Sequence, residues 1–212
     1  MRIKVIIMAR KNKEIKENNA FYIITNGAET EYNYFTLLKS RKSIYDVKVL
    51  FANKDPLGLV EYASDYLKNA NQVWCVFDID YTHRDGKLIP ALNKAKKNGV
   101  KIAFSNIAFE VWLISHFKVC NKPLQIGDYQ NELDNCLKDE NYKGNYSKNN
   151  KGMLSEYFIP RYAQAVENAR VVHQRFLRDH RKQYGENSNP KIWEWNSCTT
   201  VYKLIEALKL SK

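Results

Sequence analysis

The 212-residue sequence lacks several features that would place it in a class at once. It has no run of about 18 apolar residues, so it predicts no membrane-spanning helix. Its four cysteines form no C-x-x-C pair and lie near no pair of histidines at zinc spacing, a pattern that argues against a zinc site. Scattered thiols of this kind are typical of the cytoplasm. No G-x-x-x-x-G-K-[ST] motif occurs, so any dependence on ATP must come from another chain.

Negative charge is scarce relative to positive charge. Lys and Arg number 34 against 23 Asp and Glu, which gives a net charge of +11. Such a surplus predicts anionic partners rather than a fold: nucleic acid first, an anionic membrane surface second. The plain alternative is an AT-rich coding sequence. Residues 1–19 hold six of the cations and indicate a basic, flexible arm, in which Met8 offers a second start.

Short apolar runs alternate with helical patterns through the first half of the chain. This alternation predicts an α/β fold with a mainly parallel, four-stranded sheet flanked by helices. Thr30 and Asp55-Pro56 are candidate helix starts, and Asn98-Gly99 is a candidate helix end. The expected strands are 21–25, 45–51, 72–78 and 101–105, and the expected helices are 30–38, 55–69, 88–97 and 109–117.

The pattern changes after Lys118. Helical periodicity covers 127–138, a polar stretch over 141–151 predicts a loop, and a long helical pattern spans 155–182 with Pro160 as a candidate break. An amphipathic helix is expected over 199–210. We therefore divide the chain into an arm (1–19), a catalytic α/β domain (20–120) and a helical extension packed on it (121–212).

Two acids stand at the end of the most apolar strand, Asp78 and Asp80. Residues two apart in a strand point to the same side, so both carboxylates are expected to converge. Paired carboxylates repel unless a cation neutralises them, and oxygen ligands of this charge suit Mg²⁺ or Mn²⁺. The alternative is a pair of strand-end and helix-cap residues.

Further polar residues follow the first and fourth strands. Asn26-Gly27 ends the first strand and is followed by Glu31, which is either a site acid or a partner of the helix dipole. Glu110 lies in the first turn of the helix after the fourth strand and is expected to point toward the same sheet edge. His116 fits a buried core histidine better than a catalytic base.

Four blocks of the sequence together resemble the RloB family. They are TNGAETEYNYF (25–35), VFDID (76–80), SNIAFEVWLISHF (105–117) and TTVYKL (199–204). The resemblance runs from about Ala20 to Leu210. It implies a Toprim-like, Rossmann-like catalytic domain related to the nuclease part of OLD-type systems. It also implies a role in bacterial phage defence and abortive infection, beside an ABC-type ATPase partner.

The resemblance also implies site residues. In Toprim nucleases a Glu-Gly pair ends the first strand and a D-x-D motif ends the third. In this sequence the D-x-D motif corresponds to Asp78 and Asp80, and the acid after the first turn corresponds to Glu31. The helix that follows the fourth strand offers Glu110. One position departs from the pattern: Asn26 replaces the glutamate, and an amide oxygen ligates a metal without bringing charge.

Basic residues suggest where nucleic acid would lie. The long helical pattern contains a run of cationic residues. The simple interpretation is a solvated helix face, and the functional interpretation is a track that binds the phosphate backbone of nucleic acid. Tyr142, Tyr146 and Lys148 belong to an aromatic and basic mixture that would suit stacking on unpaired bases. The track residues are Arg170, Arg175, Arg178, Arg181 and Lys182.

These observations predict a Mg²⁺- or Mn²⁺-dependent nuclease acting on RNA, tRNA included, or on DNA. Asp78, Asp80, Glu31 and Glu110 would be catalytic, and Asn26 would complete the metal ligands. The alternative is a catalytically weak nucleic-acid-binding or regulatory subunit of an ATPase-containing complex. A third reading treats the two aspartates as turn residues. A homodimer is an expected assembly, and no membrane partner is expected.

Overall fold

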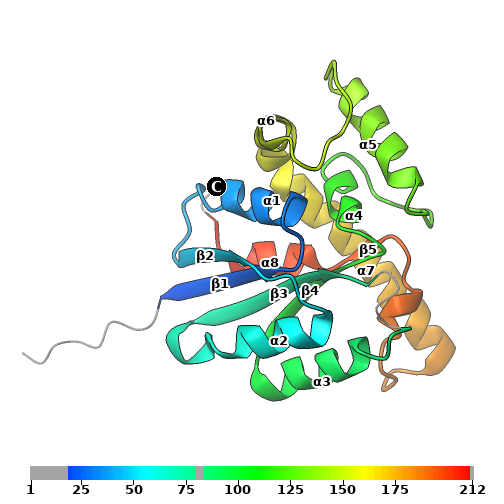
Figure 1. Ribbon diagram of the computed structural model, residues 1–212. Coiled ribbons are helices and arrows are strands. Elements are labelled where there is room, and N and C mark those ends of the chain that lie inside the picture. The colour runs from blue at the N-terminus through cyan, green and yellow to red at the C-terminus, as the bar shows by residue number, and fades with distance from the viewer. Residues whose placement is uncertain (1–18, 80–83, 211–212) are drawn as a thin grey trace, which may run out of the picture.

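The computed structural model describes residues 19–79 and 84–210, and its centre is a sheet with helices on both faces (Figure 1). Strands and helices alternate through the first half of the chain, as the sequence predicts. The strands are β1 (Ala20–Thr25), β2 (Asp46–Phe51), β3 (Gln72–Asp78) and β4 (Lys101–Asn106). The helices that follow them are α1 (Thr30–Leu38), α2 (Pro56–Ser64), α3 (Leu88–Asn98) and α4 (Glu110–Ile114), with a 3₁₀ turn at Leu67–Asn69 after α2.

The sheet has the strand order β2-β1-β3-β4-β5, with β5 at Cys198–Thr199. The first four strands are parallel, and β5 pairs antiparallel with β4. The four-stranded prediction was therefore one strand short, because a two-residue strand leaves no periodic signal in the sequence. The chain moves outward from β1 to β2 and then returns to β3. The switch point, where open α/β sheets bind ligands, thus lies between β1 and β3.

Local chemistry explains where these elements begin and end. In β3, Val73 to Phe77 are buried on both faces of the sheet, as an apolar run predicts. Asp55 caps α2 by accepting a hydrogen bond from the Gly58 N–H at 2.9 Å. Gly99 ends α3 with a left-handed φ of 84°. Thr30 does not cap α1; its hydroxyl donates to the Lys148 carbonyl at 3.5 Å.

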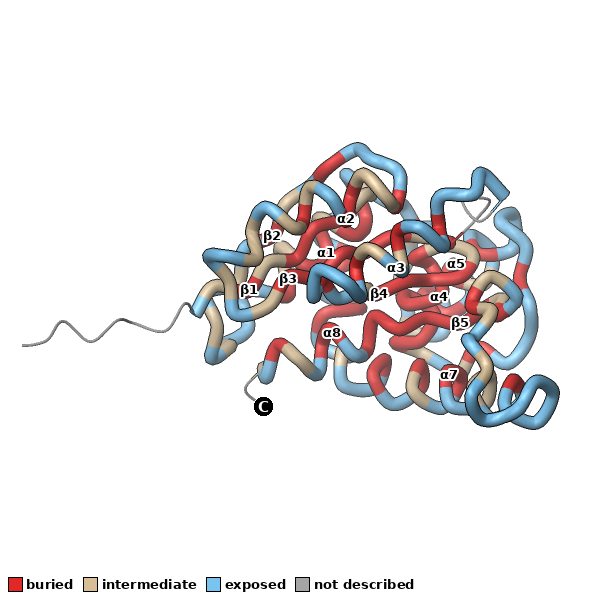
Figure 2. Tube along the Cα trace, turned by 90° about the horizontal axis from the view of Figure 1, so that it is seen from below, coloured by how far each residue is buried: buried red, intermediate tan, exposed pale blue. Residues whose placement is uncertain are grey.

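Two apolar clusters cover the two faces of the sheet. Buried residues accordingly run along the strands (Figure 2). Helices α2 and α3 pack on one face and bury Leu59, Val60 and Ala91 there. Helices α1, α4 and α8 (Val201–Ala207) contribute to the cluster on the other face. The segment predicted as a helical extension thus adds β5 to the sheet and α8 to a face of it.

The remaining helices lie beyond α4. Helix α5 (Asp128–Asp139) is followed by an irregular segment and by α6 (Lys151–Met153). A π turn (Leu154–Phe158) and a 3₁₀ turn (Ile159–Arg161) lead into α7 (Tyr162–Tyr184), so the predicted break at Pro160 is confirmed. A last 3₁₀ turn spans Ile192–Glu194. None of the helices in the described parts of the chain is long and apolar enough to cross a membrane.

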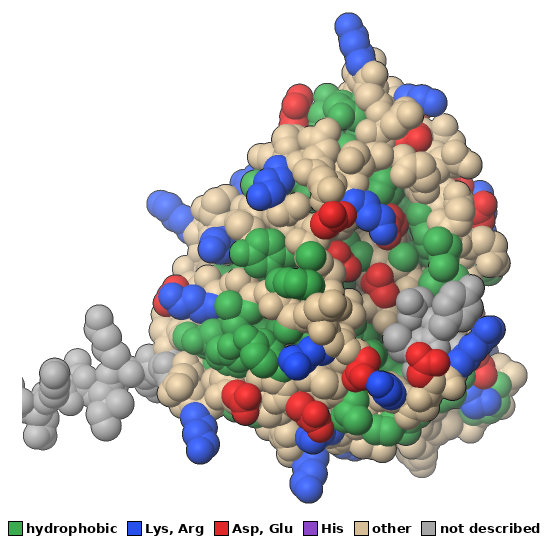
Figure 3. Space-filling view, in the orientation of Figure 1, with side chains coloured by type: hydrophobic (Ala, Val, Ile, Leu, Met, Phe, Trp, Pro, Cys, Tyr) green, Lys and Arg blue, Asp and Glu red, His purple; other side chains and the backbone are tan. Residues whose placement is uncertain are grey.

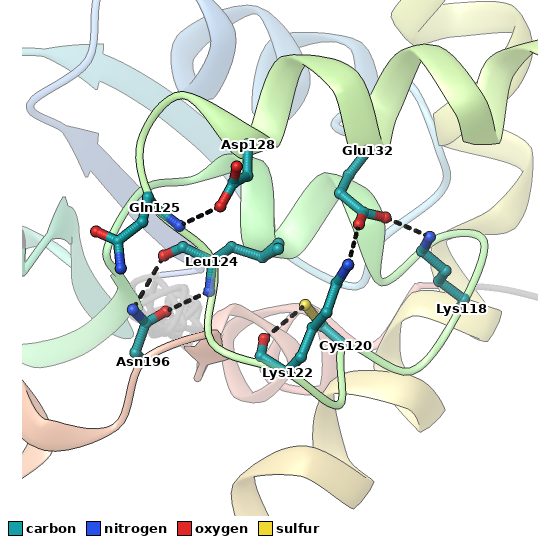
Figure 4. Close-up of polar contacts among 8 residues, drawn as sticks. All are labelled: Lys118, Cys120, Lys122, Leu124, Gln125, Asp128, Glu132 and Asn196. Carbon is teal, nitrogen blue, oxygen red and sulfur yellow. Dashed lines mark hydrogen bonds and ion pairs between the residues drawn. The ribbon is translucent and has the colours of Figure 1, made fainter.

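Polar contacts fasten α5 to the rest of the molecule (Figure 4). Glu132 pairs with Lys118 at 2.5 Å and with Lys122 at 2.7 Å. Hydrogen bonds from these two ammonium groups lower the pKa of Glu132. Asn196 donates to the Leu124 carbonyl at 3.0 Å and accepts from the Leu124 N–H at 3.2 Å. The loop between α4 and α5 is therefore held from both sides.

Candidate functional site at the sheet switch point

A cavity of about 390 Å³ opens at the carboxyl ends of β1 and β3, at the switch point of the sheet. Acidic side chains gather near the middle of this face, with a basic side chain beside them (Figure 3). The lining comes from the β1–α1 turn, the end of β3, the start of α4 and the segment before α6. Its residues are Asn26 to Glu31, Asp78, Phe109, Glu110 and Lys148.

Glu31 is the acid packed most closely against the β1–α1 turn. It lies in the first turn of α1 and is only 8% exposed. A Cβ added to Gly27 would overlap the carboxylate of Glu31, so any other residue at position 27 would force this carboxylate out of its observed position. Burial raises the pKa of Glu31, and repulsion from Glu110 adds to the rise. This site therefore holds negative charge that the protein compensates incompletely.

Glu110 enters the cavity from α4 and is 5% exposed. The Tyr146 hydroxyl donates to its Oε1 atom at 3.1 Å, and the Lys148 Nζ atom lies 3.2 Å from the same oxygen. Burial works against the charge on Lys148, but attraction by Glu110 and Glu31 outweighs it and raises the pKa of Lys148. The lysine thus supplies a positive charge beside the buried acids.

Asn26 stands where β1 ends and is half-buried. Its backbone N–H donates to the Val76 carbonyl at 3.1 Å, which ties the turn to β3. Its side-chain nitrogen donates to the Lys54 carbonyl at 3.2 Å. The side-chain oxygen is the acceptor that remains for a ligand.

Asp78 ends β3 and lines the cavity, whereas Asp80 lies outside the described residues. The structure thus brings Asn26, Glu31, Asp78 and Glu110 to one cavity. Within residues 19–79 and 84–210, no three acid, histidine or cysteine side chains approach closely enough to hold a metal ion by themselves.

A family model described as RloB-like protein matches residues 21–208, which is most of the chain. The protein belongs to the RloB-like family. No curated protein and no solved structure matches the chain.

In this RloB-like protein His116 is a core residue, as the sequence indicates. It is 1% exposed, its Nε2 atom lies 2.9 Å from the Tyr34 hydroxyl, and its Nδ1 atom lies 3.0 Å from the Trp112 carbonyl. Burial lowers its pKa to about 3, so the ring is neutral at pH 7. It does not line the cavity.

The predicted phosphate track lies on α7 and contributes no residue to the cavity. Arg170 pairs with both Glu167 and Glu206. Arg175 donates to the Asn121 side chain at 3.2 Å. The pairs Arg178–Asp179 at 3.6 Å and Arg181–Glu186 at 3.4 Å are exposed. Arg170 is thus held by acids of its own chain, while Arg178, Arg181 and Lys182 lie on the exposed side of α7.

Two residues of the 141–151 loop have roles that the sequence did not indicate. Tyr146 was expected to stack on bases, but it is 5% exposed and its hydroxyl is bound to Glu110. Lys148, part of the same aromatic and basic mixture, lines the acidic cavity and pairs with Glu110. No local signal links either residue to Glu110, because the contact depends on how the loop folds back over α4.

Proposed function

We propose that this RloB-like protein is a divalent-cation-dependent nuclease that hydrolyses phosphodiester bonds in RNA, tRNA included, or in DNA. The observation that carries the proposal is the convergence of Glu31, Asp78 and Glu110 on one cavity at the switch point of the sheet. Several carboxylates at a sheet edge that share one ammonium group, that of Lys148, suit a cation and an anionic substrate held by it.

The donor set fits Mg²⁺ or Mn²⁺. Asp78, Asp80, Glu31 and Glu110 offer carboxylate oxygens, and Asn26 offers an amide oxygen, which are the ligand types that these hard cations prefer. Burial and, to a smaller extent, repulsion from Glu110 raise the pKa of Glu31, and a cation beside the carboxylate would oppose both effects. When bound, such a cation would activate water and stabilise the charge on the leaving oxygen.

The chain's own residues have distinct tasks in this proposal. Gly27 leaves room for the Glu31 carboxylate, and Tyr146 fixes Glu110 through its hydroxyl. Lys148 holds a positive charge at the cavity that a phosphate would meet. Arg178, Arg181 and Lys182 on α7 are the candidates for contacts to the nucleic-acid backbone.

Asn26 favours a second candidate function. Where the related nucleases carry a glutamate, this chain has a neutral amide whose nitrogen is committed to the Lys54 carbonyl. A site with one acid fewer binds a cation more weakly, so the protein would act as a nucleic-acid-binding or regulatory subunit. This candidate predicts salt-sensitive binding without cleavage.

The setting of either function follows from the family resemblance. It supports a cytoplasmic effector of phage defence that works with an ABC-type ATPase, since the chain itself carries no P-loop motif. A homodimer remains the expected assembly of the chain alone.

The deciding experiment incubates the purified protein with labelled tRNA, single-stranded RNA and duplex DNA in Mg²⁺, Mn²⁺ or EDTA. Asp80→Ala is compared with Asp85→Ala, a matched change at an exposed aspartate of the same segment. Cation-dependent cleavage that is lost only in Asp80→Ala supports the nuclease. Salt-sensitive binding by all three proteins without cleavage, also with the ATPase present, supports the binding subunit.

A further inference from the structure

A second, larger cavity of about 520 Å³ lies away from the candidate site. It is lined by α3, β4, α7, the segment 189–195 and the start of α8, and none of the described residues lines both this cavity and the acidic one. Three of the helices that contribute to its lining, α3, α7 and α8, can be located in Figure 2, where α3 faces the viewer. Its volume falls in the range of about 300–1,000 Å³ that is typical of small-molecule sites.

The walls of this cavity are largely apolar and include two indole rings, Trp193 and Trp195. Trp195 is 4% exposed and is fixed by Phe176, which stacks on it at 5.8 Å between ring centroids and an interplanar angle of 18°. The His173 ring meets Trp195 edge-on at 5.8 Å. A preformed aromatic wall of this kind favours a flat, π-rich ligand over an aliphatic one.

The charge of the lining has one sign. Lys96 and Lys203 line the cavity, and none of the described aspartates or glutamates does. Glu206, one turn after Lys203 on α8, is paired with Arg170 instead. Burial lowers the pKa of Lys203, and attraction by Glu206 offsets this effect only in part. An anionic ligand group would add the counter-charge that the described lining does not contain.

A buried histidine adds a polar group at the inner wall. His173 is 4% exposed, and its Nδ1 atom lies 2.8 Å from the Tyr202 hydroxyl. Burial lowers its pKa to about 4, so the ring is neutral at pH 7. The Thr200 hydroxyl oxygen accepts from the Phe104 N–H at 3.0 Å, which leaves its proton to donate. The cavity therefore combines aromatic walls, two cations and hydrogen-bonding groups.

We infer that this cavity binds a nucleoside monophosphate, with the base against the indole rings and the phosphate toward Lys96 and Lys203. The same chemistry is offered by a free mononucleotide and by the 5′-phosphorylated end of a nucleic-acid strand. The site lies outside the acidic cavity, so the inference does not depend on whether the protein cleaves nucleic acid.

The test is a titration of the full chain, in EDTA, with the four ribonucleoside monophosphates and a 5′-phosphorylated trinucleotide. Calorimetry gives the affinity and quenching of tryptophan fluorescence reports stacking. Inorganic phosphate probes the phosphate half of the ligand, and laurate tests whether an aliphatic anion binds instead of a nucleotide. Lys203→Met and Lys96→Met are each expected to weaken binding at least tenfold. Lys97→Met, an exposed neighbour on α3 that does not line the cavity, is expected to leave it unchanged.

Quenching by monophosphates that both lysine variants weaken supports the inference, and a tighter trinucleotide would identify a strand end as the ligand. Three results overturn it: no binding of any nucleotide at millimolar concentration, equal affinity in Lys203→Met, Lys96→Met and the parent, or binding of laurate alone. Thermal unfolding of each variant confirms that it is folded, and the two lysine variants lie on different helices, so a defect in one leaves the other as the test.

Discussion

The Lys148 Nζ atom lies 3.2 Å from the Glu110 Oε1 atom and places a cation against a carboxylate that is almost fully buried. The lysine side chain itself is 62% exposed, so the pair joins a solvent-exposed ammonium group to a buried carboxylate. When this pair is broken, the Glu110 Oε1 atom keeps its hydrogen bond from the Tyr146 hydroxyl but loses its positively charged neighbour. The pair therefore links a surface loop to the centre of the candidate site.

Lys148→Met is expected to lower the free energy of unfolding by about 1–2 kcal/mol in EDTA, between the values for exposed and buried pairs. In Mn²⁺ the variant should gain more thermal stability than the parent, because no ammonium group competes for the acids. Urea unfolding and melting curves measure both effects. Lys143→Met, in the same loop and exposed, is the control. Identical curves for the two variants would contradict this account.

Gly27→Ala is expected to displace the Glu31 carboxylate, because the new Cβ would overlap it. Stability should fall by roughly 1–3 kcal/mol, and any stabilisation by Mn²⁺ should disappear. In a double-mutant cycle, Glu31→Ala should recover most of the loss caused by Gly27→Ala, since it removes the overlapping atoms. Gly127→Ala has open space around it and serves as the control. Additive effects of the two changes would rule out the steric explanation.

Glu31→Gln is expected to stabilise the protein in EDTA by on the order of 1 kcal/mol at pH 8, because it replaces a buried charge. The pKa of Glu31 is raised above 4.5 in the folded state, so ionisation at high pH costs stability. Stability from the protonated form is fully present below pH 4.5 and is lost as pH rises through the folded pKa. The advantage of the variant should therefore shrink on acidification. A difference that grows toward low pH would show that the carboxyl is not destabilised by burial.

His116 should make the fold sensitive to acid. Its pKa is about 3 in the folded state, below the ordinary 6.5. Between these two pH values His116 is protonated in the unfolded chain but neutral in the folded protein. Stability is therefore lost as pH falls from 6.5 toward 3. Between pH 7 and 5 the parent should lose roughly 2 kcal/mol more than His116→Gln. Chemical unfolding at each pH measures the two slopes, and parallel curves would exclude His116 as the cause.

Much of the fold is written locally in the sequence. The apolar run of β3 predicts a strand covered on both faces, Asp55-Pro56 predicts the start of α2, and Gly99 predicts the end of α3; the structure confirms all three. These features depend on neighbours within a few residues, so a single sequence reveals them. The sequence also predicts the bounds of α1 at Thr30 and Leu38, and the structure confirms them, but the Thr30 hydroxyl does not cap the helix and donates to the distant Lys148 carbonyl.

Some features of the candidate site also follow from the sequence, and others appear only in the structure. The sequence by itself determined that acids follow β1, β3 and β4, because residue order and the parallel pattern put those strand ends at one edge. Only the tertiary structure decided that Tyr146 and Lys148 fold back onto Glu110 and that Gly27 gives its space to Glu31. It also decided that β5 closes the sheet. The contacts of Tyr146, Lys148 and β5 join segments that are distant in the chain, and they become favourable only after the apolar clusters have brought those segments together. Gly27 and Glu31 are four residues apart, and their close approach depends on the conformation of the β1–α1 turn.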